Sequence, residues 1–467
     1  MPDNIEISLE KVQTLIKELM LQRKIMQTLR EWKSNVGTKK KALVIKGLRQ
    51  IGKTFIVRQF AKENYENEIY INFKMDENLK EAFEGSLSVN VILLNLTAMM
   101  PGIKPVPGKT LIIFDEIQEC ANARASIKFF VEDGRYDIIA MGSLLGIKGY
   151  NRKKGKGVDT GSERIVYMNP LDFEEFLWAK GISQNVIDSM RDSLTARTPI
   201  PKAIHESMLR YFKEYICVGG LPEAVNIFLS TNDMNRVYEE QRDILEEYRD
   251  DFGKHLDANE NEEVDRYLLA RIEEVFNSIP SQLAKENKKF QYSKMNAKRR
   301  SGDYREAIQW LIDAGIVSQC FNLSNLELPL EGNKIDDIFK LYMRDSGLFV
   351  AMLEKGAAGD ILSGKLGIYK GAIFENIVAD AFSKMNRKLY YYRKDSGMEI
   401  DFVTRRNGET CLIEVKATTG YAKSAKEILA HYDTYKVRQC VKLGEYNIGE
   451  NGNTLTLPYY LAFLLEE

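Results

Sequence analysis

The sequence predicts an α/β protein in which two regions of alternating strands and helices flank a helical middle. Short apolar runs at 41–46, 110–114 and 137–141 alternate with stretches of helical periodicity, which is typical of a parallel sheet covered by helices. From 171 to 278 the periodicity is helical almost throughout, and strand-like runs return in the last part of the chain. The length of 467 residues fits about three domains.

The composition excludes several classes of protein. Lys and Arg number 66 against 67 Asp and Glu, so the chain has no histone-like basic coat. The five cysteines are widely spaced and form no Cys-x-x-Cys pair, so we expect neither a disulfide framework nor a zinc site. The N-terminal segment carries charges throughout, unlike a signal peptide, and no apolar run approaches the ~20 residues of a membrane helix. We therefore expect a cytoplasmic protein with no membrane partner.

The strongest chemical signal directly follows the apolar run 41–46. Residues 47–54 read GLRQIGKT, which matches the phosphate-binding pattern GxxxxGK[ST]. Glycines allow backbone N–H groups to close around phosphate oxygens, because no Cβ atom obstructs them. Lys53 would place a positive charge at the β- and γ-phosphates, and Thr54 would bring a hydroxyl to Mg²⁺. The sequence therefore predicts a site for ATP and Mg²⁺ between a strand and a helix.

Two further strand ends complete this predicted nucleotide site. The run 111–114 ends in Asp115, which we expect to hold Mg²⁺, and in Glu116, which we expect to act as a general base on the attacking water. The run 137–141 is followed by Ser143, which either senses the γ-phosphate or serves as a turn residue or helix cap. The residues predicted to bind the nucleotide are Gly47, Arg49, Gln50, Gly52, Lys53, Thr54, Asp115 and Ser143.

These motifs, together with NPLDFEEF at 169–176, resemble the AAA-type ATPases of bacteria and archaea whose C-terminal half is a domain of unknown function. The resemblance continues in GGLP at 219–222, YMRDSGL at 342–348 and GAIFEN at 371–376. It implies ATP hydrolysis, and it allows a homo-oligomer in which an arginine finger acts on the nucleotide of a neighbouring subunit. Arg164 stands in the position of that finger, although Glu precedes it here instead of the usual Gly.

A basic segment, 281–335, follows the helical middle. Its helix, turn, helix and strand pattern is typical of a winged helix, which places one helix in the major groove of double-stranded DNA. The alternative is a spacer between two domains whose lysines form a solvated face. The basic residues of the segment are Lys285, Lys288, Lys289, Lys294, Lys298, Arg299, Arg300 and Arg305.

The C-terminal region contains a predicted hairpin. The runs 398–403 and 411–417 are joined across Asn-Gly at 407–408, which favours a two-residue type I′ turn. That turn would place Asp401 opposite Glu414, and Glu399 opposite Lys416, on one face of the sheet, with Ile400, Phe402, Ile413 and Val415 facing a core. Two facing carboxylates repel each other, so we expect a bound Mg²⁺ or Mn²⁺ to offset this cost.

The hairpin resembles the PD-(D/E)xK nuclease superfamily, with Asp401 as its acidic residue and Glu414 and Lys416 as the ExK element. The resemblance implies catalytic roles for these three residues and metal ligation by Glu375, Asp401 and Glu414. Two hypotheses remain open at this point. ATP could license a domain that cleaves DNA, or the protein could be an ATP-gated switch whose C-terminal domain contacts DNA or protein without cleavage.

These observations predict five regions along the chain. An AAA-type core, a helical region, a winged-helix-like segment and a nuclease-like domain follow an N-terminal helix. Their expected boundaries are 1–36 for the helix, 37–180 for the core, 181–280 for the helical region, 281–335 for the winged-helix-like segment and 336–467 for the nuclease-like domain.

Overall fold

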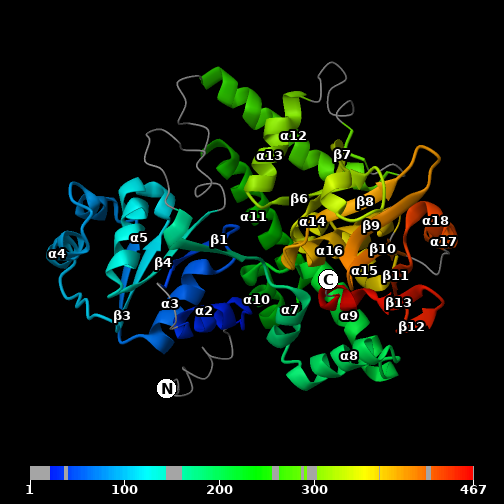
Figure 1. The fold of residues 1–467 in the computed structure, drawn as a ribbon, viewed down its shortest axis with the longest axis horizontal. Coiled ribbons are helices and arrows are strands. Elements are labelled where there is room, and N and C mark those ends of the chain that lie inside the picture. Colours follow the sequence, from blue (N-terminus) through cyan, green and yellow to red (C-terminus); the bar gives the residue numbers. More distant parts are fainter. Residues whose placement is uncertain are drawn as a thin grey trace, which may run out of the picture.

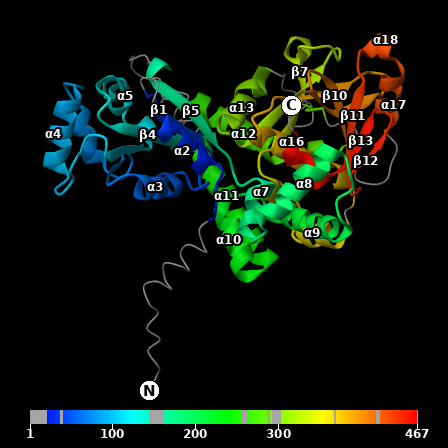
Figure 2. The same cartoon turned by 60° about the horizontal axis from the view of Figure 1, so that its bottom comes forward.

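Two β-sheets organise the chain, and helices of the middle region connect them (Figure 1). Figure 2 shows the same two lobes after rotation, with α10 and α11 beneath the junction. The computed structural model describes residues 21–35, 40–143, 160–254, 262–285, 289–291, 302–365, 367, 369–416 and 422–465.

The N-terminal sheet has five parallel strands in the order β2-β3-β4-β1-β5. Every residue of β1 and β3 is buried, which is why both strands read as continuous apolar runs rather than alternating ones. The predicted parallel sheet is confirmed. The strands are β1 (Ala42–Gly47), β2 (Asn67–Asn72), β3 (Thr110–Asp115), β4 (Asp137–Ser143) and β5 (Glu163–Met168), and the helices around them are α2 (Ile25–Ser34), α3 (Lys53–Asn64), α4 (Val89–Met99) and α5 (Ala121–Asp133).

The middle of the chain is helical, in agreement with its periodicity. Within the described ranges, every helix is too short or too polar to cross a membrane. The predicted N-terminal helix at 1–36 overlaps α2, but its first part lies outside the described residues. The middle helices are α7 (Phe173–Ala179), α8 (Gln184–Ala196), α9 (Lys202–Val218), α10 (Pro222–Thr231), α11 (Met234–Lys254), α12 (Glu262–Leu283) and α13 (Gly302–Asp313).

The C-terminal sheet has eight strands in the order β12-β13-β11-β10-β9-β8-β6-β7. Helix α16 packs across β10, β6, β8 and β7, whereas α17 contacts β9. The strands are β6 (Val317–Leu323), β7 (Lys334–Met343), β8 (Leu389–Arg393), β9 (Glu399–Arg406), β10 (Glu409–Val415), β11 (Gln439–Gly444), β12 (Gly449–Asn451) and β13 (Thr454–Pro458), and the helices are α14 (Ser346–Ala351), α15 (Ala357–Ser363), α16 (Lys370–Lys384), α17 (Lys423–Ala430) and α18 (Tyr432–Tyr435).

The strands of the segment expected to form a winged helix, β6 and the start of β7, belong to this C-terminal sheet. Strand β6 pairs in parallel with β8 and antiparallel with β7, so it is an internal strand rather than a wing. Strand β7 crosses the expected boundary at 335/336. A local pattern cannot distinguish a strand that closes a wing from one that joins strands distant in sequence. Of the basic residues, Lys288, Lys294, Lys298, Arg299 and Arg300 lie outside the described residues.

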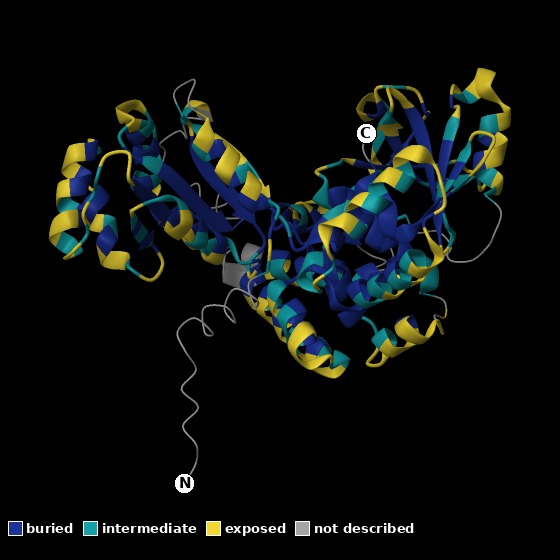
Figure 3. Cartoon of the chain, turned by 90° about the horizontal axis from the view of Figure 1, so that it is seen from below, coloured by how far each residue is buried: buried dark blue, intermediate teal, exposed yellow. Residues whose placement is uncertain are grey.

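One hydrophobic cluster runs through both lobes. It contains Leu43 of β1, Phe212 of α9, Phe374 of α16 and Phe402 of β9. Two smaller clusters cover the opposite faces of the two sheets. Figure 3 shows the buried strands of each lobe and the exposed outer faces of their helices. The two lobes therefore share a packed core through the middle helices.

Candidate functional site

The phosphate-binding motif forms the turn between β1 and α3. Strand β1 ends at Gly47, and Lys53 begins α3. Gln50 and Gly52 have φ angles of 60° and 81°, in the left-handed region that favours glycine. A Cβ atom on Gly47 would overlap the carbonyl oxygen of Met168 in β5. The glycines of the motif are therefore required by the close approach and tight curvature of the backbone.

Lys53 points back into this turn. Its Nζ donates to the carbonyl oxygens of Gly47 at 3.2 Å and Leu48 at 2.6 Å. Burial lowers the pKa of Lys53 to about 8, while the carboxylates of Glu116 and Asp115 act in the opposite direction. The side chain is thus held inside the loop, where a phosphate would find both its charge and the backbone amides.

Asp115 and Thr54 meet at the same edge of the sheet. The Thr54 hydroxyl donates to Asp115 Oδ2 at 2.7 Å, and Tyr70 in β2 donates to the same oxygen at 2.9 Å. The backbone N–H of Glu116 donates to Asp115 Oδ1 at 2.9 Å, and Gln118 donates to the Glu116 carboxylate. A hydroxyl beside a carboxylate offers the hard oxygen donors that Mg²⁺ prefers, so this pair fits the predicted cation.

Ser143 lies at the carboxyl ends of the parallel strands, whereas Arg164 lies near their amino ends. Ser143 is buried and pairs with Gly47 in the β1–β4 register, beside the phosphate-binding turn. Arg164 pairs with Leu43 at the start of β5, four residue pairs from the Gly47–Met168 pair, or about 13 Å along the strand. Arg164 is exposed there, so contact with a nucleotide would require a neighbouring subunit. Both roles stay predictions.

A cavity of about 200 Å³ adjoins the phosphate-binding turn. Its lining is mainly apolar and includes Gly52, which suits a planar base next to the phosphates. The sequence alone predicts no residue for this role, because the lining comes from three separate segments. They are the residues before α2, the start of α3 and the start of α10. The lining residues are Leu21, Arg23, Ile51, Gly52, Phe55, Ile56, Pro222 and Asn226.

The two polar side chains inside the motif contact α11. Arg49 forms an ion pair with Asp251, and Gln50 donates to Glu247, one helical turn earlier. The sequence predicted that Arg49 and Gln50 bind the nucleotide. In this structure their side chains fasten the turn to α11, and their contact with a nucleotide stays a prediction.

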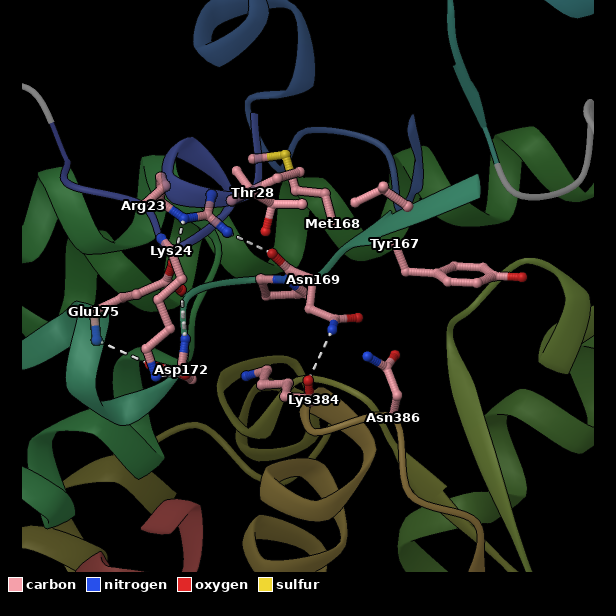
Figure 4. Close-up of a pocket in the computed structure, with 13 residues that line it drawn as sticks. Arg23, Lys24, Thr28, Tyr167, Met168, Asn169, Asp172, Glu175, Lys384 and Asn386 are labelled. Carbon is pink, nitrogen blue, oxygen red and sulfur yellow. Dashed lines mark hydrogen bonds and ion pairs between the residues drawn. The ribbon is translucent and has the colours of Figure 1, made fainter. Parts of the chain in front are cut away.

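A second cavity, of about 170 Å³, lies where the two lobes meet (Figure 4). Buried Arg23 donates to the carbonyl oxygens of Ile51 at 3.0 Å and Asn169 at 2.5 Å, and it pairs with Glu175 at 3.2 Å. The Asn169 side chain donates to the carbonyl oxygen of Lys384 at the end of α16. Arg23 and Asn169 therefore connect the phosphate-binding turn to the C-terminal lobe.

The motifs at 219–222 and 342–348 contact each other at this junction. The Gly220 N–H donates to Asp345 Oδ2 at 2.7 Å, and a Cβ atom on Gly219 would overlap the Asp345 carboxylate. Arg344 donates to Asn169 Oδ1 at 2.8 Å. These sequence motifs thus reflect close packing between the middle helices and the C-terminal lobe.

The predicted hairpin register in the C-terminal sheet is correct. Asn407 and Gly408 both have positive φ angles, and the pairing Ile413–Phe402 leads directly to Asp401 opposite Glu414. Asp401 Oδ2 accepts a hydrogen bond from the Val415 N–H at 2.8 Å.

The expected placement of one apolar residue is wrong. Phe402, Ile413 and Val415 share the core on the α16 side, but Ile400 packs on the opposite face of the sheet. The register between β8 and β9 shifts between Tyr390 and Tyr392, and such a bulge reverses the alternation of side chains.

The carboxylates near this hairpin are paired with cations. Glu414 pairs with Lys416, and Glu399 pairs with Arg393 and, at 2.8 Å, with Lys340 of β7. Lys340, whose side chain is fully buried, is not predicted from the sequence. Burial alone lowers the pKa of Lys340, but Glu375, Glu399 and Asp401 raise it well above its ordinary value. Lys340 therefore remains an ammonium ion.

This arrangement does not fit the predicted divalent cation. Among the described residues, no group of three or more His, Cys, Asp or Glu side chains is placed to hold a metal ion. Glu375 accepts from the Tyr342 hydroxyl at 3.1 Å and lies 3.7 Å from the Lys340 ammonium. The predicted ligands Glu375, Asp401 and Glu414 do share a neighbourhood, but lysines lie among them.

Comparison with family models divides the chain into three matched parts. Residues 39–177 match a family described as an AAA domain. Residues 209–358 and 370–460 match two families, DUF8612 and DUF4143, each described as a domain of unknown function. No curated protein matches the chain.

Several solved structures resemble the chain loosely. The Aeropyrum pernix ORC2 protein in its ADPNP-ADP complexes has 11% identity and a TM-score of 0.34, covering 77% of this chain and 95% of that one. The Thermotoga maritima RuvB Holliday junction branch migration motor has 13% identity and a TM-score of 0.27, covering 67% and 91%. C. elegans PCH-2 has 11% identity and a TM-score of 0.27, covering 48% and 66%. Resemblances of this size do not specify a function.

The family match and the site geometry agree for the N-terminal lobe. The matched segment contains the phosphate-binding turn, the Thr54–Asp115 contact and the five parallel strands that carry them. Residues 39–177 of this chain are therefore an AAA-type ATPase domain.

Proposed function

We propose that the protein binds ATP with Mg²⁺ at residues 47–54, hydrolyses it, and passes the nucleotide state to the C-terminal lobe as an ATP-gated switch. The observation that carries the proposal is the convergence of Lys53, Thr54, Asp115 and Glu116 at one edge of the N-terminal sheet. A lysine, a hydroxyl and two carboxylates supply charge, cation contacts and a base in one place.

Each residue has a distinct role in this reaction. Lys53 and the amides of the turn hold the phosphates, and the apolar cavity beside Gly52 receives the base. Thr54 and Asp115 would hold the cation, which neutralises charge on the phosphates when bound. Glu116, oriented by Gln118, accepts a proton from the attacking water.

The switch is supported by the contacts that leave the site. Arg23 bonds both to the phosphate-binding turn and to Asn169, and Asn169 in turn bonds to Arg344 and to the end of α16. A shift of the turn on nucleotide binding would reach α16 through the buried side chain of Arg23 and the half-buried Asn169. α16 packs on the C-terminal sheet, so that lobe would respond.

ATP binding and turnover of purified full-length variants test the proposal. Lys53→Ala should lose ATP binding, and Glu116→Gln should bind ATP but hydrolyse it about 10²–10⁴-fold more slowly. Lys62→Ala, an exposed lysine on the same helix, is the matched control and should behave like the wild type. Normal ATP affinity in Lys53→Ala, or normal turnover in Glu116→Gln, would contradict the assignment.

Double-stranded DNA is the partner that the basic segment favours. Reversal of Arg299 and Arg300 to Glu should weaken DNA binding, and affinity should fall steeply with salt because phosphate contacts release counterions. ATP turnover with and without DNA would then link binding to the switch. Unchanged turnover together with salt-insensitive binding would remove DNA as a partner.

Cleavage of DNA by the C-terminal lobe is a second candidate, favoured by the facing register of Asp401 and Glu414. A comparison of supercoiled plasmid nicking by wild type, Asp401→Ala and Glu414→Ala in Mg²⁺ tests it. Equal nicking by all three proteins would exclude this activity. The ion pair between Glu414 and Lys416, and the hydrogen bond from the Val415 N–H to Asp401, lead us to expect that result.

A further inference from the structure

Lys340 occupies an unusual place in the C-terminal sheet. It lies on β7, its side chain is fully buried, and its ammonium lies 4.6 Å from the centre of the Tyr391 ring. A buried lysine is costly unless carboxylates surround it. Here the carboxylates come from two different elements, Glu375 of α16 and Glu399 of β9, at 3.7 Å and 2.8 Å.

The charges around Lys340 are nearly balanced without a metal. Four carboxylates gather here, and three cations accompany them. The carboxylates are those of Glu375, Glu399, Asp401 and Glu414, and the cations are Lys340, Arg393 and Lys416. A divalent cation added to this group would reverse its net charge. The divalent cation would also have to displace the ammonium of Lys340, whose side chain is fully buried.

The position of the ammonium is that of a bridging cation. A metal ion in a carboxylate site joins ligands from separate elements, and the Lys340 ammonium joins α16 to β9 in the same manner. Asp401 is engaged separately, because one of its oxygens accepts the backbone N–H of Val415. The three acids predicted as metal ligands are thus held by protein donors.

We propose that the Lys340 ammonium takes the place of a divalent cation between Glu375 and Glu399, so that removal of its charge opens a latent metal site. The C-terminal lobe of the natural protein then folds and acts without a metal. The proposal goes beyond the ATP-dependent function, and it does not depend on ATP hydrolysis.

Mn²⁺ binding by the full-length chain, without nucleotide, tests this inference. All proteins carry Asp115→Asn, which removes the carboxylate predicted to hold the cation of the nucleotide site, so that this site does not contribute a metal signal. The set comprises this background, the background with Lys340→Met, and the background with Lys334→Met, a half-buried lysine at the start of the same strand. Mn²⁺ titration followed by electron paramagnetic resonance reports binding, and thermal unfolding in EDTA or Mn²⁺ reports stabilisation.

We expect no C-terminal Mn²⁺ binding in the background and in Lys334→Met. Lys340→Met should lose stability in EDTA, bind one Mn²⁺, and regain stability as Mn²⁺ rises. Further addition of Glu375→Gln should abolish the gain, because it removes one of the two bridged carboxylates. A folded Lys340→Met protein that neither binds Mn²⁺ nor is stabilised by it would overturn the proposal.

The proposal can also fail without this variant. If Lys340→Met does not fold, Lys340→Gln provides the same test with a side chain that can still donate to the carboxylates. In addition, if the Asp115→Asn background itself binds Mn²⁺, and Asp401→Ala or Glu414→Ala removes that binding, Lys340 does not replace the metal. A failure of ATP hydrolysis in the wild type would leave each of these outcomes unchanged.

Discussion

Each of the two lobes brings carboxylates together, but the groups that contact these carboxylates differ between the lobes. In the N-terminal lobe, Asp115 accepts only from hydroxyls and a backbone N–H, and among the described residues no cation forms an ion pair with it. In the C-terminal lobe, Glu399 and Glu414 each pair with a lysine or an arginine. A cluster of acids alone therefore does not indicate a metal site, because the counter-charges decide what can bind.

The largest effect is expected from a variant that removes one of the cations of the C-terminal lobe. Lys340→Ala removes the buried ammonium that bridges Glu375 and Glu399, which should lower the free energy of unfolding by about 3–5 kcal/mol. Lys388→Ala is the matched control, since this lysine is 72% exposed and pairs with Glu331, and it should cost about 0–1 kcal/mol. Urea denaturation of both proteins in EDTA measures the difference. Equal losses would mean that Lys340 does not neutralise the cluster.

Local chemistry explains what the sequence could predict. The motif at 47–54 requires glycine for its backbone, and Asn407 and Gly408 fix the hairpin register through their positive φ angles. Both signals lie within a few residues of the feature that they specify. Asp115 could also be predicted from the sequence, because it ends a fully buried strand that follows the phosphate-binding motif in the chain.

The remaining features depend on contacts between distant segments. Lys340 and Glu399 are 59 residues apart, and only the strand order β9-β8-β6-β7 brings them together. Arg23 meets Asn169 across 146 residues. The bulge in β9 that turns Ile400 away from the expected core leaves no mark on the alternation of apolar residues. No periodicity within a single segment could have revealed these features.

A second experiment tests Asp115, the carboxylate of the N-terminal lobe. Asp115→Asn should lower ATP turnover by about 10–100-fold, because Asp115 orients the Thr54 hydroxyl toward the cation. Its free energy of unfolding should change by less than about 1 kcal/mol, since no buried cation loses its partner. Glu399→Gln is the counterpart in the other lobe and should destabilise the chain more, because Lys340 and Arg393 lose a charge partner. A stable Glu399→Gln protein would contradict the comparison.

The pH dependence of ATP affinity tests Lys53, the lysine of the nucleotide site. Burial lowers the pKa of Lys53 to about 8 in the free protein, and phosphates should raise it on binding. Below pH 8 the ammonium is already present, so affinity should be flat. Above pH 8 a proton must be taken up on binding, and affinity should fall by up to about tenfold per pH unit.

Calorimetry of ATP binding at pH 8.5, in buffers of different ionisation enthalpy, measures this proton uptake. Lys62→Ala should show the same uptake as the wild type, because that side chain is exposed and outside the turn. An affinity independent of pH between about 8 and 9.5 would mean that Lys53 is protonated throughout. Its surroundings would then resemble the paired lysines of the other lobe.

The smallest expected effect concerns Arg49, which combines features of both sites. It lies in the nucleotide motif, yet its guanidinium pairs with Asp251 of α11, and the two side chains are 30% and 12% exposed. Partly exposed ion pairs contribute little, so Arg49→Ala should change ATP affinity by less than about fivefold, and turnover should change little. Arg242→Ala, on the surface of the same helix, is the control for general effects on α11. If turnover in Arg49→Ala instead fell about 10³-fold, the guanidinium would have to leave Asp251 and contact the phosphates during the reaction. The pairing with α11 would then describe only the nucleotide-free state, and the turn would release the helix whenever ATP binds.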